Sequence, residues 1–184
     1  MFHQCIEDCN SCINIKSNFS KAYRRKGLAL VQLLKFGESV AAYKEAMAFD
    51  KDMAIRNELE EAQDLENNYN RYFKAVQNEE YADALGCINY LVSKIDSNDT
   101  LKLYKVECMA KTGDTAGALT LLKSIAIATT QHPDTWYLKG IIELYGGDSA
   151  RAKKFFMEGM RLDPDNNKCR LALNKAKSCE KLKE

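Results

Sequence analysis

The chain has 184 residues, of which 46% are hydrophobic and 29% are charged. This mixture is typical of a folded domain and excludes intrinsic disorder, while nine Gly and two Pro exclude a collagen-like chain. The formal net charge of +1 provides no overall field that would attract nucleic acid or an anionic membrane. The longest apolar runs, such as residues 28–34, are far shorter than the ~20 residues that cross a bilayer. We therefore expect neither a nucleic-acid nor a membrane partner.

The seven cysteines are an odd number, and the first residues, Met1-Phe2-His3-Gln4-Cys5, include polar groups where a signal peptide would be apolar. We therefore expect reduced thiols and a cytoplasmic protein. A nuclear location remains an alternative, as does the lumen of the endoplasmic reticulum if a signal peptide has been removed.

Four segments of the chain align on one template and begin at Ser20, Leu65, Asp99 and Pro133. The last three begin 34 residues apart, and the first two are separated by one such repeat plus 11 residues. In each segment a small residue opens the second half and a bulky residue follows four positions later: Ser39 and Tyr43, Ala84 and Ile88, Ala118 and Leu122, Ala152 and Phe156. This periodicity predicts pairs of closely packed helices. Strands are not expected, because no stretch shows sustained alternation of polar and apolar residues.

The repeat register divides the chain into seven parts. We expect the second helix of an incomplete repeat at 1–19, repeats at 20–53, 65–98, 99–132 and 133–166, a helical insert at 54–64, and a capping helix or further repeat at 167–184. Apolar residues advance by three or four between positions 55 and 76, which predicts one long helix over about 53–76. That helix would span roughly 36 Å. Because no first helix precedes residues 1–19, we also expect the chain to be part of a longer protein.

This pattern resembles the tetratricopeptide repeat, whose marks are a 34-residue period and Trp/Leu/Gly/Tyr, Ala, Phe and Pro positions. The match is close at 20–53 and 133–166 and looser at 65–98, where Tyr72 replaces the glycine. The resemblance implies an all-α fold, a right-handed superhelix of about ten helices in antiparallel pairs. Each pair would bury its apolar face against the next.

Lys21 and Arg25 are four residues apart and therefore lie on one face of a helix. Five basic residues and no acidic one occur from Lys16 to Lys26. Two cations at this spacing suit a carboxylate, which a guanidinium can bind bidentately. The alternative is a solvated basic helix face.

The stretch Lys21-Ala22-Tyr23-Arg24-Arg25-Lys26 is similar to the third repeat of carboxylate-clamp co-chaperones. This resemblance implies that Lys21 and Arg25 bind the acidic C-terminal tails of heat-shock chaperones. The other clamp residues, a Lys and two Asn, come from two preceding repeats that this chain lacks. We therefore expect weak tail binding, about millimolar.

The stretches from Lys102 to Ala110 and from Arg161 to Asn166 resemble the repeat region of DnaJ-type co-chaperones. In that family a J domain follows. The tripeptide His132-Pro133-Asp134 is typical of a J domain, but here it lies at a repeat boundary, where Pro suits the first helical position. The function we expect is a co-chaperone scaffold. The alternatives are a repeat scaffold unrelated to chaperones and a regulatory domain of a larger enzyme.

The repeat register directs a set of apolar residues toward an inner groove that could hold a client segment: Tyr69, Phe73, Leu103, Tyr137 and Ile141. The alternative is that some of them pack between helices. Substituting Tyr137 and Ile141 distinguishes the two, because only core residues would cause a large loss of thermal stability.

No catalytic, cofactor or metal site is expected from the motifs. Cys5, Cys9 and Cys12, near His3, share one helix face but lack the second pair that zinc sites prefer, so we interpret them as packing residues. The Gly-rich turns lack phosphate-binding spacings, and two histidines provide no catalytic constellation. We therefore expect no enzyme activity.

Charge is distributed unevenly along the chain. Residues 50–83 hold ten acidic and four basic residues, whereas residues 151–184 hold ten basic and five acidic ones. These regions are either solvated helix faces or complementary surfaces for a partner domain.

Overall fold

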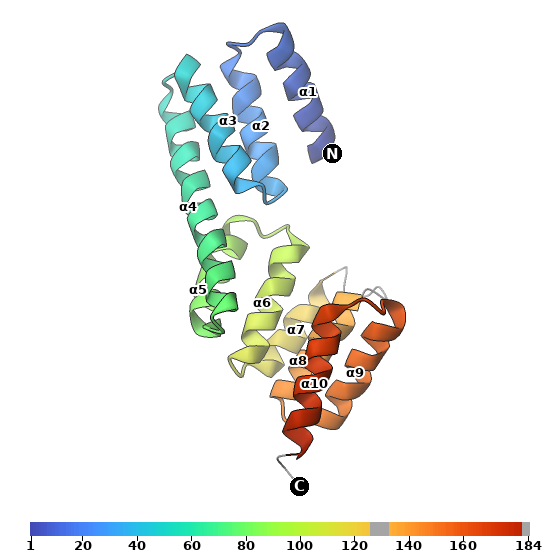
Figure 1. Cartoon of the computed structure of the whole chain (residues 1–184). Helices are drawn as coiled ribbons and strands as arrows, with labels where there is room; N and C mark the ends of the chain where they lie inside the picture. Colours follow the sequence, from blue (N-terminus) through green and yellow to red (C-terminus); the bar gives the residue numbers. More distant parts are fainter. Residues whose placement is uncertain (126–132, 182–184) are drawn as a thin grey trace. The chain divides into compact units, whose positions relative to one another are not determined.

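The computed structural model describes residues 1–125 and 133–181, and every regular element in these ranges is an α-helix (Figure 1). In chain order the helices are α1 (Phe2–Ile15), α2 (Ser20–Gln32), α3 (Phe36–Phe49), α4 (Met53–Gln77), α5 (Tyr81–Lys94), α6 (Asp99–Lys111), α7 (Thr115–Ser124), α8 (Pro133–Tyr145), α9 (Ser149–Leu162) and α10 (Asn167–Lys181). The prediction of an all-α chain of about ten helices is confirmed. Within the described ranges, no helix is both long and apolar enough to cross a membrane.

The chain forms two compact units, Met1–Arg71 and Tyr72–Glu184. The boundary falls within α4, the longest helix at 25 residues, so the predicted long helix near 53–76 is confirmed. Its buried residues Ile55, Ala62 and Leu65 recur at intervals of seven and three, which places them on one face of the helix. Tertiary burial of this stripe, rather than helix propensity alone, stabilises such a helix.

In the first unit α2 packs between α1 and α3, and the close approach of α2 to α3 depends on Gly27. A Cβ atom at Gly27 would lie 2.9 Å from the ring of Tyr43, which is only 1% exposed. The Ser39 hydroxyl on α3 donates a hydrogen bond of 2.9 Å to the Gly27 carbonyl. Gly27 and Ser39 therefore allow the two helices to pack closely, as predicted from the small residues of the repeat pattern.

In the second unit the α8–α9 pair packs in the same way. A Cβ atom at Gly140 would lie 2.3 Å from the ring of Phe156, whose side chain is completely buried. The surrounding core draws on α6, α7, α8, α9 and α10, which pack on one another. Figure 1 shows α9 and α10 side by side and antiparallel.

Acidic and amide side chains determine where several helices of the second unit begin. Asp114 accepts a hydrogen bond from the Gly117 N–H at 2.9 Å, and Asp148 accepts one from the Arg151 N–H at 2.8 Å. Each follows a glycine with positive φ, as expected for a turn that L side chains disfavour. Helix α8 begins at Pro133 as predicted, whereas His132 lies outside the described residues.

Candidate functional site

A groove of about 780 Å³ lies along α1 and α2 in the first unit. Its lining is mostly apolar and includes Met1, Cys5, Cys9, Phe19, Ala22 and Leu28. The charged side chains in the lining are Asp8, Lys21, Arg24 and Arg25. The groove therefore combines an apolar wall with more cations than anions, which suits an acidic ligand that also carries apolar groups.

The cations of the groove differ in their partners. Arg24 forms a bidentate ion pair with Glu58 of α4, with nitrogen–oxygen distances of 2.6 and 2.8 Å. Hydrogen bonding to Glu58 and its charge raise the pKa of Arg24. Lys21 and Arg25 are exposed, and among the residues that the structure describes neither forms an ion pair. The two cations predicted from the sequence are thus the ones available to a ligand.

The apolar wall remains accessible to a ligand because two large side chains are only partly covered. Phe19 is 38% exposed and Leu28 is 49% exposed. Burial, followed by the neighbouring Cys5, raises the pKa of the Cys9 thiol to about 11, so this thiol is protonated at neutral pH. Cys9 therefore contributes apolar surface to the groove and no nucleophile.

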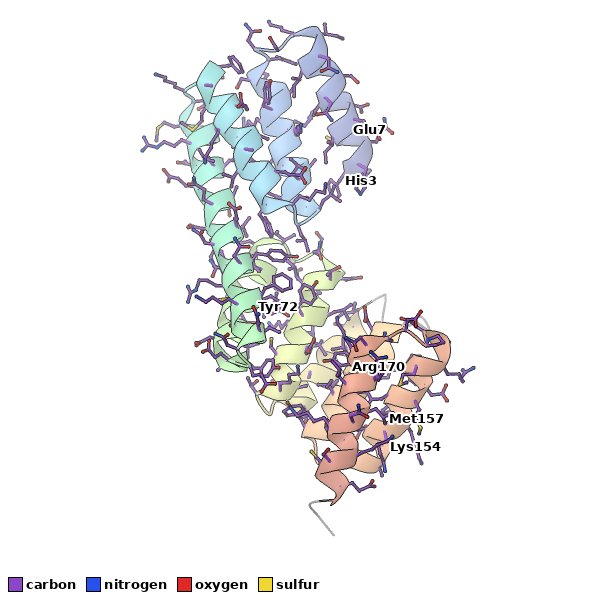
Figure 2. The ribbon with its side chains drawn as sticks, in the orientation of Figure 1. His3, Glu7, Tyr72, Lys154, Met157 and Arg170 are labelled. Carbon is purple, nitrogen blue, oxygen red and sulfur yellow. The ribbon has the colours of Figure 1, made fainter. Side chains whose placement is uncertain are left out.

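Of the residues that suggested a metal site on α1, the three cysteines line the groove, whereas His3 does not. Cys9 is buried, Cys5 is half-buried and Cys12 is exposed, all three as free thiols. Figure 2 shows His3 and Glu7 on the side of α1 away from α2; both are exposed, and neither lines the groove. In the described part of the chain, no group of three or more His, Cys, Asp or Glu side chains is arranged to hold a metal ion.

The predicted inner-groove residues of α4 and α6 are partly exposed, and the two aromatic ones pack on other aromatic rings. In the first unit the Tyr69 ring meets Phe36 edge-on, with ring centroids 5.1 Å apart. In the second unit Phe73 is 44% exposed and lies 5.8 Å from the Tyr104 ring. Leu103 is half-buried against the core of that unit.

Tyr72, which replaces the glycine of the repeat pattern, is buried beside Phe73 and Tyr104. Its ring stacks on Tyr104 at 5.3 Å, and Figure 2 shows it on the side of α4 that faces α6. The aromatic side chain thus occupies space that the glycine of other repeats leaves to a neighbour.

Tyr137 and Ile141 belong to the core, and the expectation that they line an open groove is wrong. They are 7% and 3% exposed and pack in the cluster formed by α6 to α10. The alternative that some of these residues pack between helices therefore applies to this pair. The physical reason is that α8 is covered by α6, α9 and α10, so its apolar positions have no free face.

A polar network that the sequence did not predict joins three helices of the second unit. Glu107 Oε1 accepts hydrogen bonds from the Tyr137 hydroxyl and from Lys111 Nζ, each at 2.7 Å. Lys111 Nζ also donates to the Tyr81 hydroxyl at 3.1 Å. Burial lowers the pKa of Lys111, but the charge of Glu107 and these hydrogen bonds outweigh it and raise the pKa. The spacing of four between Glu107 and Lys111 is a sequence signal from which their ion pair could have been predicted, whereas the tyrosines come from other helices.

Comparisons with known proteins agree with this architecture. The family model described as tetratricopeptide repeat matches residues 133–166. The chain is 22% identical to DnaJ homolog subfamily C member 7 of Homo sapiens, in an alignment covering 100% of this chain and 37% of that protein. It is also 22% identical to DnaJ homolog subfamily C member 3 of Gallus gallus, over 89% of this chain and 33% of that protein. The chain thus spans about a third of the length of these curated relatives.

A solved structure supports the fold. The crystal structure of the P58(IPK) TPR domain has a TM-score of 0.61 and 19% sequence identity, covering 96% of this chain and 50% of that chain. At this identity the likeness shows the fold alone. One segment, residues 133–166, thus matches the tetratricopeptide repeat, the fold of the chain is similar to that of the P58(IPK) TPR domain, and its sequence is similar to those of DnaJ subfamily C proteins.

Proposed function

We propose that the chain is a co-chaperone scaffold whose α1–α2 groove binds an acidic segment ending in a free carboxylate, as the C-terminal tails of heat-shock chaperones do. The observation that carries this proposal is the pairing of Lys21 and Arg25. Both are exposed on the lining of an apolar groove, and no carboxylate in the described residues neutralises either of them.

The chemistry of the groove explains how such a segment would bind. Arg25 can grip a terminal carboxylate with two parallel hydrogen bonds, and Lys21 adds a point charge one helical turn away. An aliphatic side chain of the ligand would lie on Phe19 and Leu28, where burial of apolar area favours binding. Asp8 opposes an acidic ligand, and two exposed cations provide limited affinity, so we expect a Kd of about 1 mM.

The compartment that we propose for this function is the cytoplasm. All seven cysteines are free thiols, as a reducing compartment favours.

The test is a titration of the ¹⁵N-labelled chain with an acidic peptide that ends in a free carboxylate, followed by NMR. We expect shifts of amide signals in α1 and α2 that disappear in Lys21→Ala and in Arg25→Ala. Lys26→Ala is the matched control, because it removes the same charge from α2 at a residue that does not line the groove. An amidated peptide should bind more weakly, because it lacks the terminal charge.

Two results would contradict the proposal. Equal weakening by Lys26→Ala would show that the basic helix attracts the peptide only through its overall charge. Equal binding of the amidated peptide would show that the terminal carboxylate is not recognised.

A further inference from the structure

The outer surface of α9 and α10 in the second unit carries three cations without a carboxylate or ring partner in the described residues: Lys154, Arg170 and Lys177. All three are exposed, and Arg170 donates one hydrogen bond, to the neutral Asn167 amide oxygen at 2.9 Å. The other described cations of these helices are engaged by carboxylates or aromatic rings: Arg151, Lys153, Arg161, Lys168 and Lys175. In this region, therefore, Lys154, Arg170 and Lys177 remain available to a ligand, whereas the other described cations are already paired.

The available cations surround an exposed apolar side chain. The ion pair of Lys153 on α9 with Glu180 on α10 aligns the two antiparallel helices, so that Lys154 lies near the level of Lys177. Met157, one turn further along α9, is 52% exposed. Figure 2 shows Lys154, Met157 and Arg170 together on this side of α9 and α10. We call these residues, with Lys177, the α9–α10 face.

The spacing of the cations on the α9–α10 face matches the spacing of side chains along a partner helix. Arg170 and Lys177 are seven residues apart on α10, which corresponds to two helical turns, or about 10.5 Å. Carboxylates seven residues apart on an incoming helix have the same separation. An apolar residue midway between them would then lie over Met157.

We propose that the α9–α10 face binds an acidic amphipathic helix of a partner protein, with two carboxylates opposite Arg170 and Lys177 and an aliphatic side chain on Met157. A membrane would need a broader apolar surface than one methionine supplies. A nucleic-acid backbone would need a longer track of cations, and here Glu158 and Glu180 interrupt it. The proposal does not depend on the α1–α2 groove, because all its residues belong to the second unit.

The test measures fluorescence anisotropy of a labelled, stapled helical peptide that carries two glutamates seven positions apart and a leucine midway between them. At low ionic strength we expect saturable binding to the chain. Lys154→Glu, Arg170→Glu and Lys177→Glu should each weaken it at least tenfold. Lys123→Glu is the matched control, since it makes the same charge change at an exposed residue of α7 and should leave binding unchanged. Thermal melts should confirm that all variants fold.

A second peptide of the same composition, with its glutamates five positions apart, should bind at least tenfold more weakly because its charges lie on different faces of the helix. Equal binding of the two peptides would overturn the proposal, as would absence of saturable binding or equal weakening by Lys123→Glu. Stronger binding of phosphatidylserine vesicles or of single-stranded RNA that depends on the same three cations would also overturn it. Unchanged binding in Lys21→Ala would show that the two surfaces act independently.

Discussion

The α8–α9 pair and the α6–α7 pair occupy the same repeat positions with opposite choices of side-chain size. In α8–α9 the first helix contributes Gly140 and the second contributes Phe156, whose ring fills the space above the glycine. In α6–α7 the corresponding residues are Val106 and Leu122, and both are buried. The comparison teaches that dense packing between the two helices of these pairs is reached by side chains of matching size rather than by one particular residue.

The α2–α3 pair of the first unit has the same arrangement as α8–α9, a glycine on its first helix opposite an aromatic ring on its second. Gly27 on α2 faces Tyr43 on α3, although the contact is less tight than that of Gly140 with Phe156. Repeats with a glycine on the first helix thus carry an aromatic ring on the second, and the Val106 repeat carries an aliphatic side chain.

The largest expected effect comes from Gly140→Ala, which adds volume where the α8–α9 pair has none. We expect the free energy of unfolding to fall by about 3 kcal/mol, because the new methyl group would clash with the fully buried Phe156 ring. Urea denaturation measures this. The added variant Phe156→Leu should reduce the cost of Gly140→Ala, as expected for residues in contact.

Alanine substitutions at two other glycines serve as comparisons for the stability change caused by Gly140→Ala. Gly27→Ala should cost about 1–2 kcal/mol, since its methyl group meets Tyr43 at a longer distance. Gly86→Ala should stabilise the protein by about 0.5–1 kcal/mol, because no described atom lies within 4 Å of a Cβ there and alanine favours helix. Similar losses of stability in all three variants would contradict the different amounts of space that the structure shows around these glycines.

Tyr137→Phe tests whether the core of the second unit depends on its polar network as well as on volume. Phenylalanine keeps the ring but removes the hydroxyl that donates to Glu107. We expect a loss of about 2 kcal/mol in the free energy of unfolding, because this hydrogen bond has a charged acceptor. Tyr145→Phe is the control, since the Tyr145 hydroxyl contacts exposed Lys175 at 3.4 Å and should contribute little. Equal effects of the two variants would contradict the role of Glu107.

A smaller loss in the free energy of unfolding should appear at alkaline pH, because of the thiol of Cys169 in the core beside α8 and α9. Burial, followed by nearby Asp134 and Asp163, raises the pKa of the Cys169 thiol from 9.0 to about 11. The folded state therefore keeps this proton when the unfolded chain releases it, so stability is complete below pH 9 and falls as the pH rises toward 11. We expect a loss of about 1–2 kcal/mol over this range. Urea midpoints at several pH values should show a shallower slope in Cys169→Ala, and an unchanged slope would exclude the thiol.

The helical architecture could be predicted because its causes are local. The 34-residue period, the apolar stripe between positions 55 and 76 and the turn residues near Gly113 and Gly147 all act within one or two helices. The cations Lys21 and Arg25 could also be identified, because a spacing of four places both on one helix face whatever surrounds it. Their role in binding stays a prediction.

The sequence by itself thus determined the helices, their pairing and the small and large positions at which the pairs meet, since these follow from periodicity along one chain. Only the tertiary structure decided which polar and apolar groups remain accessible. Tyr137 and Ile141 have the pattern of groove residues, yet α6, α9 and α10 cover them. Arg24 is neutralised by Glu58, 34 residues away, while its neighbour Arg25 is not. The physical reason is that burial and ion pairing depend on contacts between helices far apart in sequence, which helical periodicity does not encode.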